Sequence, residues 1–218
     1  GLPAGIKITT ANIQDELARR RLGIGRGARQ KFEKDELEIL GGVRHGLTIG
    51  APVAIKINNS EWPKWQDVMS ADPIDENILK DLARNAPLTK PRPGHADLVG
   101  MQKYGFDDAR PVLERASARE TAARVALGSL AKKFLQQVAN VEVISHVVQL
   151  GTVKTPDGII PDKNSLAKID NDPARCFDEQ TSKKMQEEVE LAHKDGDHLS
   201  LLKIFTKYRE IKTSDIKN

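Results

Sequence analysis

Residues 116–138 carry the longest helical pattern in this 218-residue chain, and that pattern restricts what the chain can fold into. Small residues such as Ala122 and Ala126 recur on one face at helical spacing. A face of small side chains lets a helix lie close against a sheet. Residues 141–150, and the alternating apolar positions within 49–59, are typical of strands. The pattern therefore predicts long and short helices packed on strands.

Shorter elements are predicted on either side of this helix. Caps, apolar spacing and Pro or Gly breaks mark their ends. They are a helix capped by Thr10, a strand over 37–40, a long loop over 60–75, a helix over 75–85 and a last amphipathic helix over 179–193.

The composition is that of an ordinary globular chain. Lys and Arg number 34 against 31 Asp and Glu, so the net charge is only +3. The nine aromatic residues are too few for the base-stacking platforms of single-strand nucleic-acid binders. No apolar run approaches the length of about 20 residues that a membrane helix needs. The single cysteine, Cys176, cannot form an internal disulfide, is predicted to be a packing residue, and favours a reducing cytoplasm.

The ends of the chain carry further expectations. No secretory signal pattern precedes the first helix, and the chain begins with Gly1 in place of Met, which indicates that residues upstream are missing or were removed. The histidines make no metal-ligand spacing with carboxylates or the thiol, so no metal site is predicted.

The small net charge conceals one strongly basic segment, residues 19–34. It holds seven basic residues and a single acidic residue, and three glycines alternate within it. Several guanidinium groups beside a glycine-rich turn suit a phosphorylated ligand, because each offers a planar pair of donors. A solvated basic face or a nucleic-acid patch would show the same charge, and the residues leave these alternatives open.

The hexapeptide Arg92–Asp97 is a second candidate site. Its prolines fix the approach of the backbone, and His95 has a side chain that titrates near neutral pH. His95 could act as a general acid or base. It could equally be a loop histidine whose ring is bound by Asp97 or by a backbone carbonyl.

A third candidate lies where the long helix begins. Ser117 and Glu120 have the spacing of a capping box. Arg115 and Arg119 lie at the positive end of the helix, where backbone N–H groups and guanidinium groups can together hold a phosphate. The cap and the phosphate site are compatible, because they need not use the same groups.

These motifs, taken in order along the chain, resemble those of the chorismate synthase family in its actinobacterial form. The resemblance extends from Gly1 to about Asp197, whereas the lysine-rich residues 198–218 do not align. The motifs that carry it are Arg19–Gly27, Val43–Gly46, Gly50–Pro52, Arg92–Asp97, Lys103–Gly105, Arg115–Ala122, Ala174–Cys176 and Lys184–Met185.

The resemblance implies a lyase that removes phosphate from 5-enolpyruvylshikimate-3-phosphate by a 1,4-anti elimination to give chorismate. It implies reduced FMN as cofactor, leaves reduction of the flavin by NADPH open, and implies a cytoplasmic homotetramer that binds no nucleic acid or membrane. The implied fold is α/β, of the α+β type, a β-α-β sandwich particular to this family.

The resemblance also assigns roles to individual residues. His95 matches the family histidine that lies near the flavin and to which its protonation is attributed. Arg115, Ala116 and Ser117 match a segment that binds FMN. Three arginines match residues that bind the phosphate of the substrate or of a nicotinamide cofactor; they are Arg20, Arg26 and Arg29.

Two departures from the family pattern are expected to matter. The chain starts after the family's first strand and its Gly-Glu-Ser-His-Gly motif, and the family's second half is absent, so the fold is expected to be incomplete and the chain an inactive fragment or a poorly active one. The alternative is a non-catalytic module that binds anions or nucleic acid through residues 19–34.

Overall fold

The structure is a computed structural model that describes residues 1–24, 35–116, 118–194 and 202–207; for 118, 119 and 202–207 it describes the backbone alone. Its α-helices are α1 (Thr10–Arg19), α3 (Glu76–Lys80), α4 (Asp97–Tyr104), α5 (Arg110–Ala116), α6 (Ala118–Ala139), α7 (Leu166–Asn171) and α8 (Glu179–Lys194). Its strands are β1 (Leu37–Gly41), β2 (Val43–Arg44), β3 (Leu47–Thr48), β4 (Ala54–Ile57), β5 (Ile144–Leu150), β6 (Val153–Lys154) and β7 (Leu202–Lys207).

The strands form small antiparallel sheets. β1 pairs with β4, with Leu37 opposite Ile57, and β2 pairs with β3. β5 lies between β6 and β7 in the order β6-β5-β7. β7 belongs to the segment expected not to align, and it pairs with β5 from Ile144 opposite Lys207 to Leu150 opposite Leu202. The mixture of helices and strands that the sequence predicts is confirmed.

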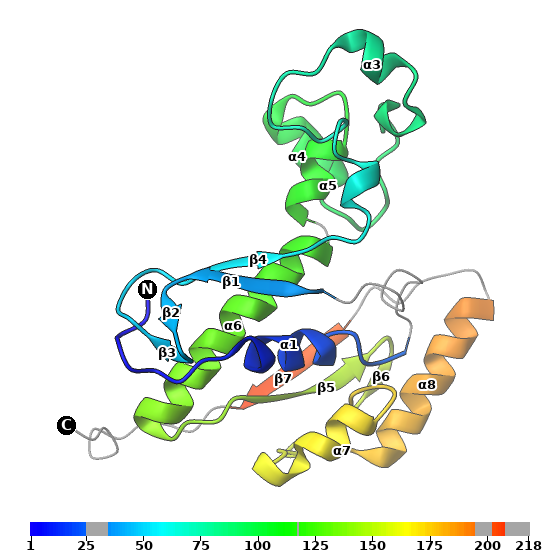
Figure 1. Cartoon of the computed structure of the whole chain (residues 1–218). Coiled ribbons are helices and arrows are strands. Elements are labelled where there is room, and N and C mark those ends of the chain that lie inside the picture. Colours follow the sequence, from blue (N-terminus) through cyan, green and yellow to red (C-terminus); the bar gives the residue numbers. More distant parts are fainter. Residues whose placement is uncertain (25–34, 117, 195–201, 208–218) are drawn as a thin grey trace.

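Helix α6 is the centre of the larger hydrophobic core. It runs past the β1–β4 hairpin and α1 (Figure 1). Its small residues Ala122 and Ala126 are buried against Ile8, Ile13 and Leu17, each of which is fully buried. Because short side chains occupy this face, α1 approaches the helix closely. The small-residue face is buried as predicted, but its close neighbour is a helix, whereas a sheet was predicted.

A second, smaller core lies under the β6-β5-β7 sheet. Val147 of β5 packs there with Ala174 and Cys176, and Met185 of α8 is fully buried among them. Cys176 is a packing residue, as predicted. The described residues of the body thus form two hydrophobic cores.

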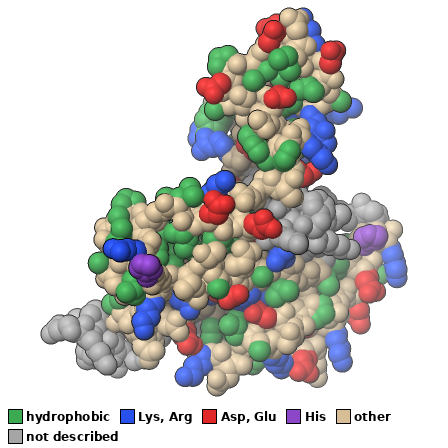
Figure 2. Space-filling model, in the orientation of Figure 1, with side chains coloured by type: hydrophobic (Ala, Val, Ile, Leu, Met, Phe, Trp, Pro, Cys, Tyr) green, Lys and Arg blue, Asp and Glu red, His purple; other side chains and the backbone are tan. Residues whose placement is uncertain are grey.

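Residues 60–116 form a lobe that projects from this body (Figure 1). Hydrophobic, basic and acidic side chains all appear on its surface (Figure 2). Within it the ring of Trp65 is contacted by the guanidinium groups of Arg84 and Arg110, at 5.6 and 5.2 Å from the ring centroid. Contacts between charged groups and an aromatic ring replace a large apolar core here.

Several element boundaries differ from those predicted. Thr9, not Thr10, caps α1, because its hydroxyl accepts from the backbone of Asn12 while the Asn12 side chain accepts from the backbone of Thr9. The predicted helix over 75–85 divides into α3 and a 3-10 turn at Ala83–Asn85. The predicted strand over 49–59 is shortened to β4, which begins after Pro52, a residue that cannot donate to a ladder.

Two helices that the sequence did not predict, α4 and α5, precede the long helix. The predicted helix over 116–138 begins at Ala118, and α5 (Arg110–Ala116) precedes it as a separate helix. The expected cap, Ser117, lies outside the described residues. Helix α4, directly after His95, was not predicted, because its sequence mixes Gly, polar and apolar residues without a clear period.

Candidate functional site

His95 is exposed on a turn of the lobe, directly before α4. Its Nδ1 lies 2.9 Å from the carbonyl oxygen of Pro93. A carbonyl can only accept, so this hydrogen bond requires the proton of the neutral ring to be on Nδ1. Nε2 is then the unprotonated nitrogen of the neutral ring. The sequence left two interpretations of His95 open, a loop histidine bound by a carbonyl and a group for acid–base chemistry. The carbonyl partner is present, and it leaves Nε2 able to do acid–base chemistry.

The turn that carries His95 is closed by an ion pair between Arg92 and Asp97. The backbone N, Nε and Nη2 of Arg92 donate to the two carboxylate oxygens of Asp97 at 3.0, 2.9 and 3.0 Å. The side chain of Asp97 is 2% exposed, whereas that of Arg92 is 49% exposed. The hydrogen bonds from Arg92 lower the pKa of the Asp97 carboxyl to about 2. Asp97 is therefore charged across the whole range in which a histidine titrates.

Arg115 lies near the end of α5 in the same lobe. Its Nη1 donates to the hydroxyl of Tyr104 at 3.0 Å, and its guanidinium lies 5.5 Å from the centroid of that ring. The ring of Tyr104 also stacks on Phe106, with centroids 5.7 Å apart. The aromatic pair thus supports the guanidinium of Arg115 from one side and leaves its Nε and Nη2 without a partner among the described residues.

Helix α6 begins two residues after the exposed Ala116, so Arg115 lies next to a helix N-terminus. The first N–H groups of a helix have no partner within it, and the helix dipole is positive there. A fork of free guanidinium donors beside such an end suits a phosphate. The described residues of this segment, Arg115 and Ala116, therefore fit the phosphate end of a mononucleotide cofactor, while Ser117 lies outside the described residues.

The basic segment is described only in part. Arg20, at the end of α1, donates through Nε and Nη2 to the buried carboxylate of Asp35, both at 3.2 Å. Arg19 donates to Glu16 and to both oxygens of Asp170. Arg26 and Arg29 lie outside the described residues. The two arginines at the start of the segment therefore hold carboxylates of this chain.

His95, Arg115 and Ala116 all belong to the lobe of residues 60–116, whereas Arg20 directly follows α1 in the body (Figure 1). The contact of Tyr104 with Arg115 was not predicted. Gly105, which ends α4 in the αL conformation, is a local sign of a helix end, but the contact itself depends on how α4 and α5 pack.

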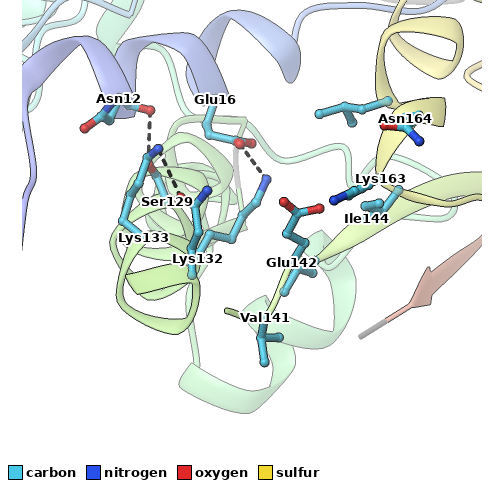
Figure 3. A pocket seen from close by; sticks show the side chains of 13 residues that line it. Asn12, Glu16, Ser129, Lys132, Lys133, Val141, Glu142, Ile144, Lys163 and Asn164 are labelled. Carbon is cyan, nitrogen blue, oxygen red and sulfur yellow. Dashed lines mark hydrogen bonds and ion pairs between the residues drawn. The ribbon is translucent and has the colours of Figure 1, made fainter. Parts of the chain in front are cut away.

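A separate polar cavity of about 420 Å³ lies between α1, α6 and the start of β5 (Figure 3). Lys132, Lys133 and Lys163 line it together with Glu16 and Glu142. Because both signs of charge line the cavity, it is not specific for an anion. Within the described ranges there is no group of three or more potential metal ligands and no helix long and apolar enough to cross a membrane.

The family model described as chorismate synthase matches residues 1–202. The chorismate synthases of Streptomyces avermitilis and Frankia casuarinae are 65% and 64% identical to it over 199 residues, which make up 91% of this chain and 50% of each relative. A crystal structure of chorismate synthase superposes with a TM-score of 0.65 at 28% identity, over 94% of this chain and 52% of that one. The α/β fold expected from the resemblance is thereby confirmed.

The chain spans about half the length of the relatives it matches. The match nevertheless covers most of the chain, including the His95 turn and the Arg115 segment. The chain therefore belongs to the chorismate synthase family.

Proposed function

We propose that this chain provides the His95 and Arg115 part of a chorismate synthase site, at which phosphate leaves 5-enolpyruvylshikimate-3-phosphate by 1,4-anti elimination. The observation that carries the proposal is the exposed Nε2 of His95, set by the bond of Nδ1 to Pro93, in the same lobe as Arg115. An elimination of this kind needs a group that exchanges a proton near the cofactor and cationic donors for the phosphate groups.

Arg115, with the first N–H groups of α6, would hold the phosphate of FMN. Reduced FMN, when bound, supplies the electron density for breaking the bond to the leaving phosphate and recovers it afterwards. The chain's own residues then have simple tasks. Tyr104 holds Arg115 in place, and His95 gives or takes a proton at Nε2.

Arg20, Arg26 and Arg29 are proposed to bind the phosphate of the substrate or of NADPH. Among the residues that the structure describes, Arg20 contacts Asp35 through Nε and Nη2, and we propose that its Nη1 meets a phosphate oxygen. The fixed orientation of the guanidinium lowers the entropy that such a contact would cost. A cytoplasmic homotetramer, with no nucleic-acid or membrane partner, is part of the same proposal, and so is a division at residue 197 between the family core and a short tail.

The alternative, a nucleic-acid module on residues 19–34, has less support. Arg19 already contacts the carboxylates of Glu16 and Asp170 through Nε, Nη1 and Nη2, so its charge is compensated within the chain. A phosphate backbone would have to compete with these pairs.

Binding of FMN to the whole chain, measured by quenching of flavin fluorescence, tests the proposal. We expect Arg115→Ala to weaken FMN binding by about tenfold or more, because a charge-assisted contact to phosphate is lost. Arg124→Ala removes an exposed arginine of α6 paired with Glu120, and it should leave FMN binding unchanged.

Two outcomes would count against the proposal. Equal FMN affinity in wild type and Arg115→Ala would remove Arg115 from the cofactor site. Absence of flavin binding, together with binding of a single-stranded RNA that weakens steeply with salt, would support the nucleic-acid module instead.

A further inference from the structure

The turn at residues 92–97 holds a buried anion, Asp97, and an exposed base, His95. The side chain of Asp97 is 2% exposed, while His95, two residues earlier, is exposed. In the part of the chain that the structure describes, the hydrogen bonds to the Asp97 carboxylate come from Arg92. The buried carboxylate thus takes its hydrogen bonds from the start of its own turn, while His95 acts on it only through a smaller Coulombic interaction.

We propose that Arg92 and Asp97 are positioning residues for His95, which hold its turn in the shape that keeps the proton on Nδ1 and makes Nε2 the atom that exchanges protons. The catalytic meaning of this tautomer rests on the function proposed above. The positioning itself depends only on the contacts within the turn.

The geometry of the pair explains how it fixes the turn. Two side-chain donors and one backbone donor of Arg92 meet both oxygens of a single carboxylate. The side-chain fork sets the plane of the carboxylate, and the backbone bond sets where the chain enters the turn. Asp97 is also the first residue of α4, so the far end of the turn is fixed by a helix. The four residues between the two ends, Pro93 to Ala96, are therefore held at both ends.

The contact between Nδ1 of His95 and the oxygen of Pro93 lies inside this closed turn. The two residues are only two positions apart, so the distance between these atoms depends on the backbone angles of the turn. In a free imidazole side chain the neutral ring prefers its proton on Nε2. The turn reverses this preference, because only a proton on Nδ1 can be donated to the carbonyl.

The ion pair stays charged over a wide range of pH. Arg92 lowers the pKa of Asp97 to about 2, and the carboxylate in turn raises the pKa of Arg92. Both partners are charged from pH 4 to pH 9, so the pair holds the turn throughout that range. Two neutral residues in place of Arg92 and Asp97 would hold the turn more weakly, because hydrogen bonds between neutral groups are weaker than those between charged groups.

Nitrogen NMR of the whole chain, labelled with ¹⁵N in its histidines, tests the proposal. Long-range proton–nitrogen correlations distinguish protonated from unprotonated ring nitrogens, and His95→Gln identifies the signals of His95 among the five histidines. For the neutral wild-type ring we expect Nδ1 at the shift of a protonated nitrogen and Nε2 at that of an unprotonated one.

In Asp97→Asn, which keeps the size of the side chain but loses its charge, we expect the two nitrogen shifts of His95 to move toward the free-imidazole pattern, with the proton on Nε2. Arg92→Lys, which keeps the charge but cannot form the fork, should move them in the same direction. Asp107→Asn changes an exposed aspartate of the same lobe and should leave them unchanged.

Signals of His45 and His146, which lie in the body, report whether each variant is folded. Unchanged His95 shifts in folded Asp97→Asn and in Arg92→Lys would overturn the proposal and reduce the pair to a structural contact. The nitrogen shifts are measured without flavin, so the test remains valid even if the proposed function is wrong.

Discussion

At the scale of single residues, Asp97 of the lobe is held as a charged carboxylate by Arg92. Its side chain is nearly fully buried, and its pKa is lowered from the usual 3.8 to about 2 by hydrogen bonds from Arg92. A carboxyl whose pKa is lower in the folded chain than in the unfolded chain stabilises the fold above the unfolded value. That contribution is fully present above pH 4 and is lost as the pH falls toward 2.

We expect Asp97→Asn to lower the free energy of unfolding at pH 7 by about 1–2 kcal/mol, a value below the full linkage energy because Arg92 is half exposed. Urea unfolding of both proteins between pH 7 and pH 2 measures the difference, which should shrink as the pH falls below 4. Asp107→Asn is the control and should behave as wild type throughout. A difference that is constant down to pH 2 would contradict the assigned charge.

Cys176 is the clearest case of a buried titratable group. The thiol is 1% exposed, and burial, together with the nearby charges of Asp172 and Asp178, raises its pKa to about 11. Only the thiolate reacts with disulfide reagents, so both its burial and its pKa slow the reaction.

We expect the native chain to react with the reagent DTNB at pH 8 at least about 100-fold more slowly than the chain unfolded in guanidinium chloride, since few thiols are ionised three pH units below such a pKa. The chain has one cysteine, so the absorbance reports Cys176 alone. Reaction of the native chain at the unfolded rate would show that the thiol is accessible and the smaller core open.

At the scale of elements, the packing of α4 against α5 depends on one glycine. A Cβ atom placed on Gly100 would lie 2.4 and 2.7 Å from the two methyl groups of Val112. Val112 is buried and β-branched, so its methyl groups cannot move aside easily. Gly100 therefore allows a close approach of the two helices that carry the His95 turn and Arg115.

Replacing Gly100 by Ala should destabilise the lobe by about 1–3 kcal/mol, because overpacking outweighs the gain of about 1 kcal/mol in helix propensity. Gly128→Ala is the matched control, since Gly128 is also helical but a Cβ atom placed on it would meet no neighbouring element within 4 Å. Thermal unfolding should show a lower Tm for the first variant and an equal or higher one for the second. A higher Tm in both would show that the helices separate without cost.

The same elements show where prediction from the sequence succeeds. Helices α6 and α8 and strand β5 have long apolar periods, and each was predicted within a few residues of its observed bounds. Helices α4 and α5 were not predicted, because Gly100 and the αL residue Gly105 make sense only in a packed hairpin. Their stability comes from tertiary contacts, which no local pattern carries.

The candidate site also has a part that the sequence predicts and a part that depends on the fold. His95 and Arg115 could be selected from the sequence because their chemistry and neighbours are local. The support of Arg115 by Tyr104, and the pairing of Arg20 with Asp35, join residues 11 and 15 positions apart in ways that depend on the packed backbone. Residue type therefore predicts the chemistry, and the fold decides which donors remain free.

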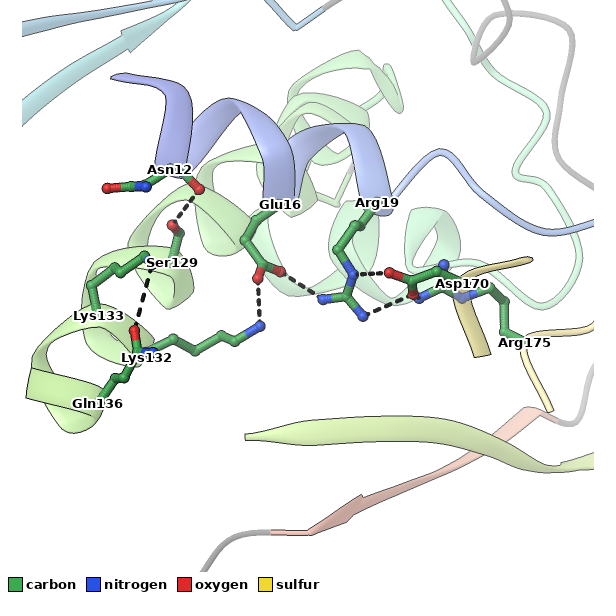
Figure 4. A network of polar contacts seen from close by, with 9 residues as sticks. All are labelled: Asn12, Glu16, Arg19, Ser129, Lys132, Lys133, Gln136, Asp170 and Arg175. Atoms are coloured by element: carbon green, nitrogen blue, oxygen red, sulfur yellow. Dashed lines mark hydrogen bonds and ion pairs between the residues drawn. The ribbon is translucent and has the colours of Figure 1, made fainter. Parts of the chain in front are cut away.

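At the scale of the whole molecule, polar contacts join the two hydrophobic cores. Arg19 of α1, beside the larger core, donates to Asp170 of α7 at 2.8 and 3.1 Å (Figure 4). Arg175, next to the smaller core, contacts the same carboxylate at 2.7 Å. These side chains are about one-fifth exposed. Glu16 extends the network to Lys132 of α6, so α1, α6 and α7 meet through charged groups.

Burial and ion pairing act in opposite directions on the pKa of Glu16, and ion pairing has the larger effect. Burial raises the pKa of its carboxyl, but the contacts with Lys132 and Arg19 outweigh burial, and the pKa is lowered overall. A charged Glu16 keeps both cations in place at neutral pH. The pairs of Arg19 and Arg175 with Asp170 thus add a charged contact between the two cores.

Removing the central carboxylate should loosen that connection. We expect Asp170→Ala to lower the free energy of unfolding by about 2–3 kcal/mol, because two partly buried guanidinium groups lose their shared partner. Hydrogen exchange should quicken most in α7 and α8, which lie beside the smaller core, and least in α6. Asp157→Ala is the control, since it removes only an exposed pair with Lys154, and it should change neither measurement. Equal acceleration of exchange in α6 and α8 would show instead that the two cores unfold as one unit and that their connection does not depend on Asp170.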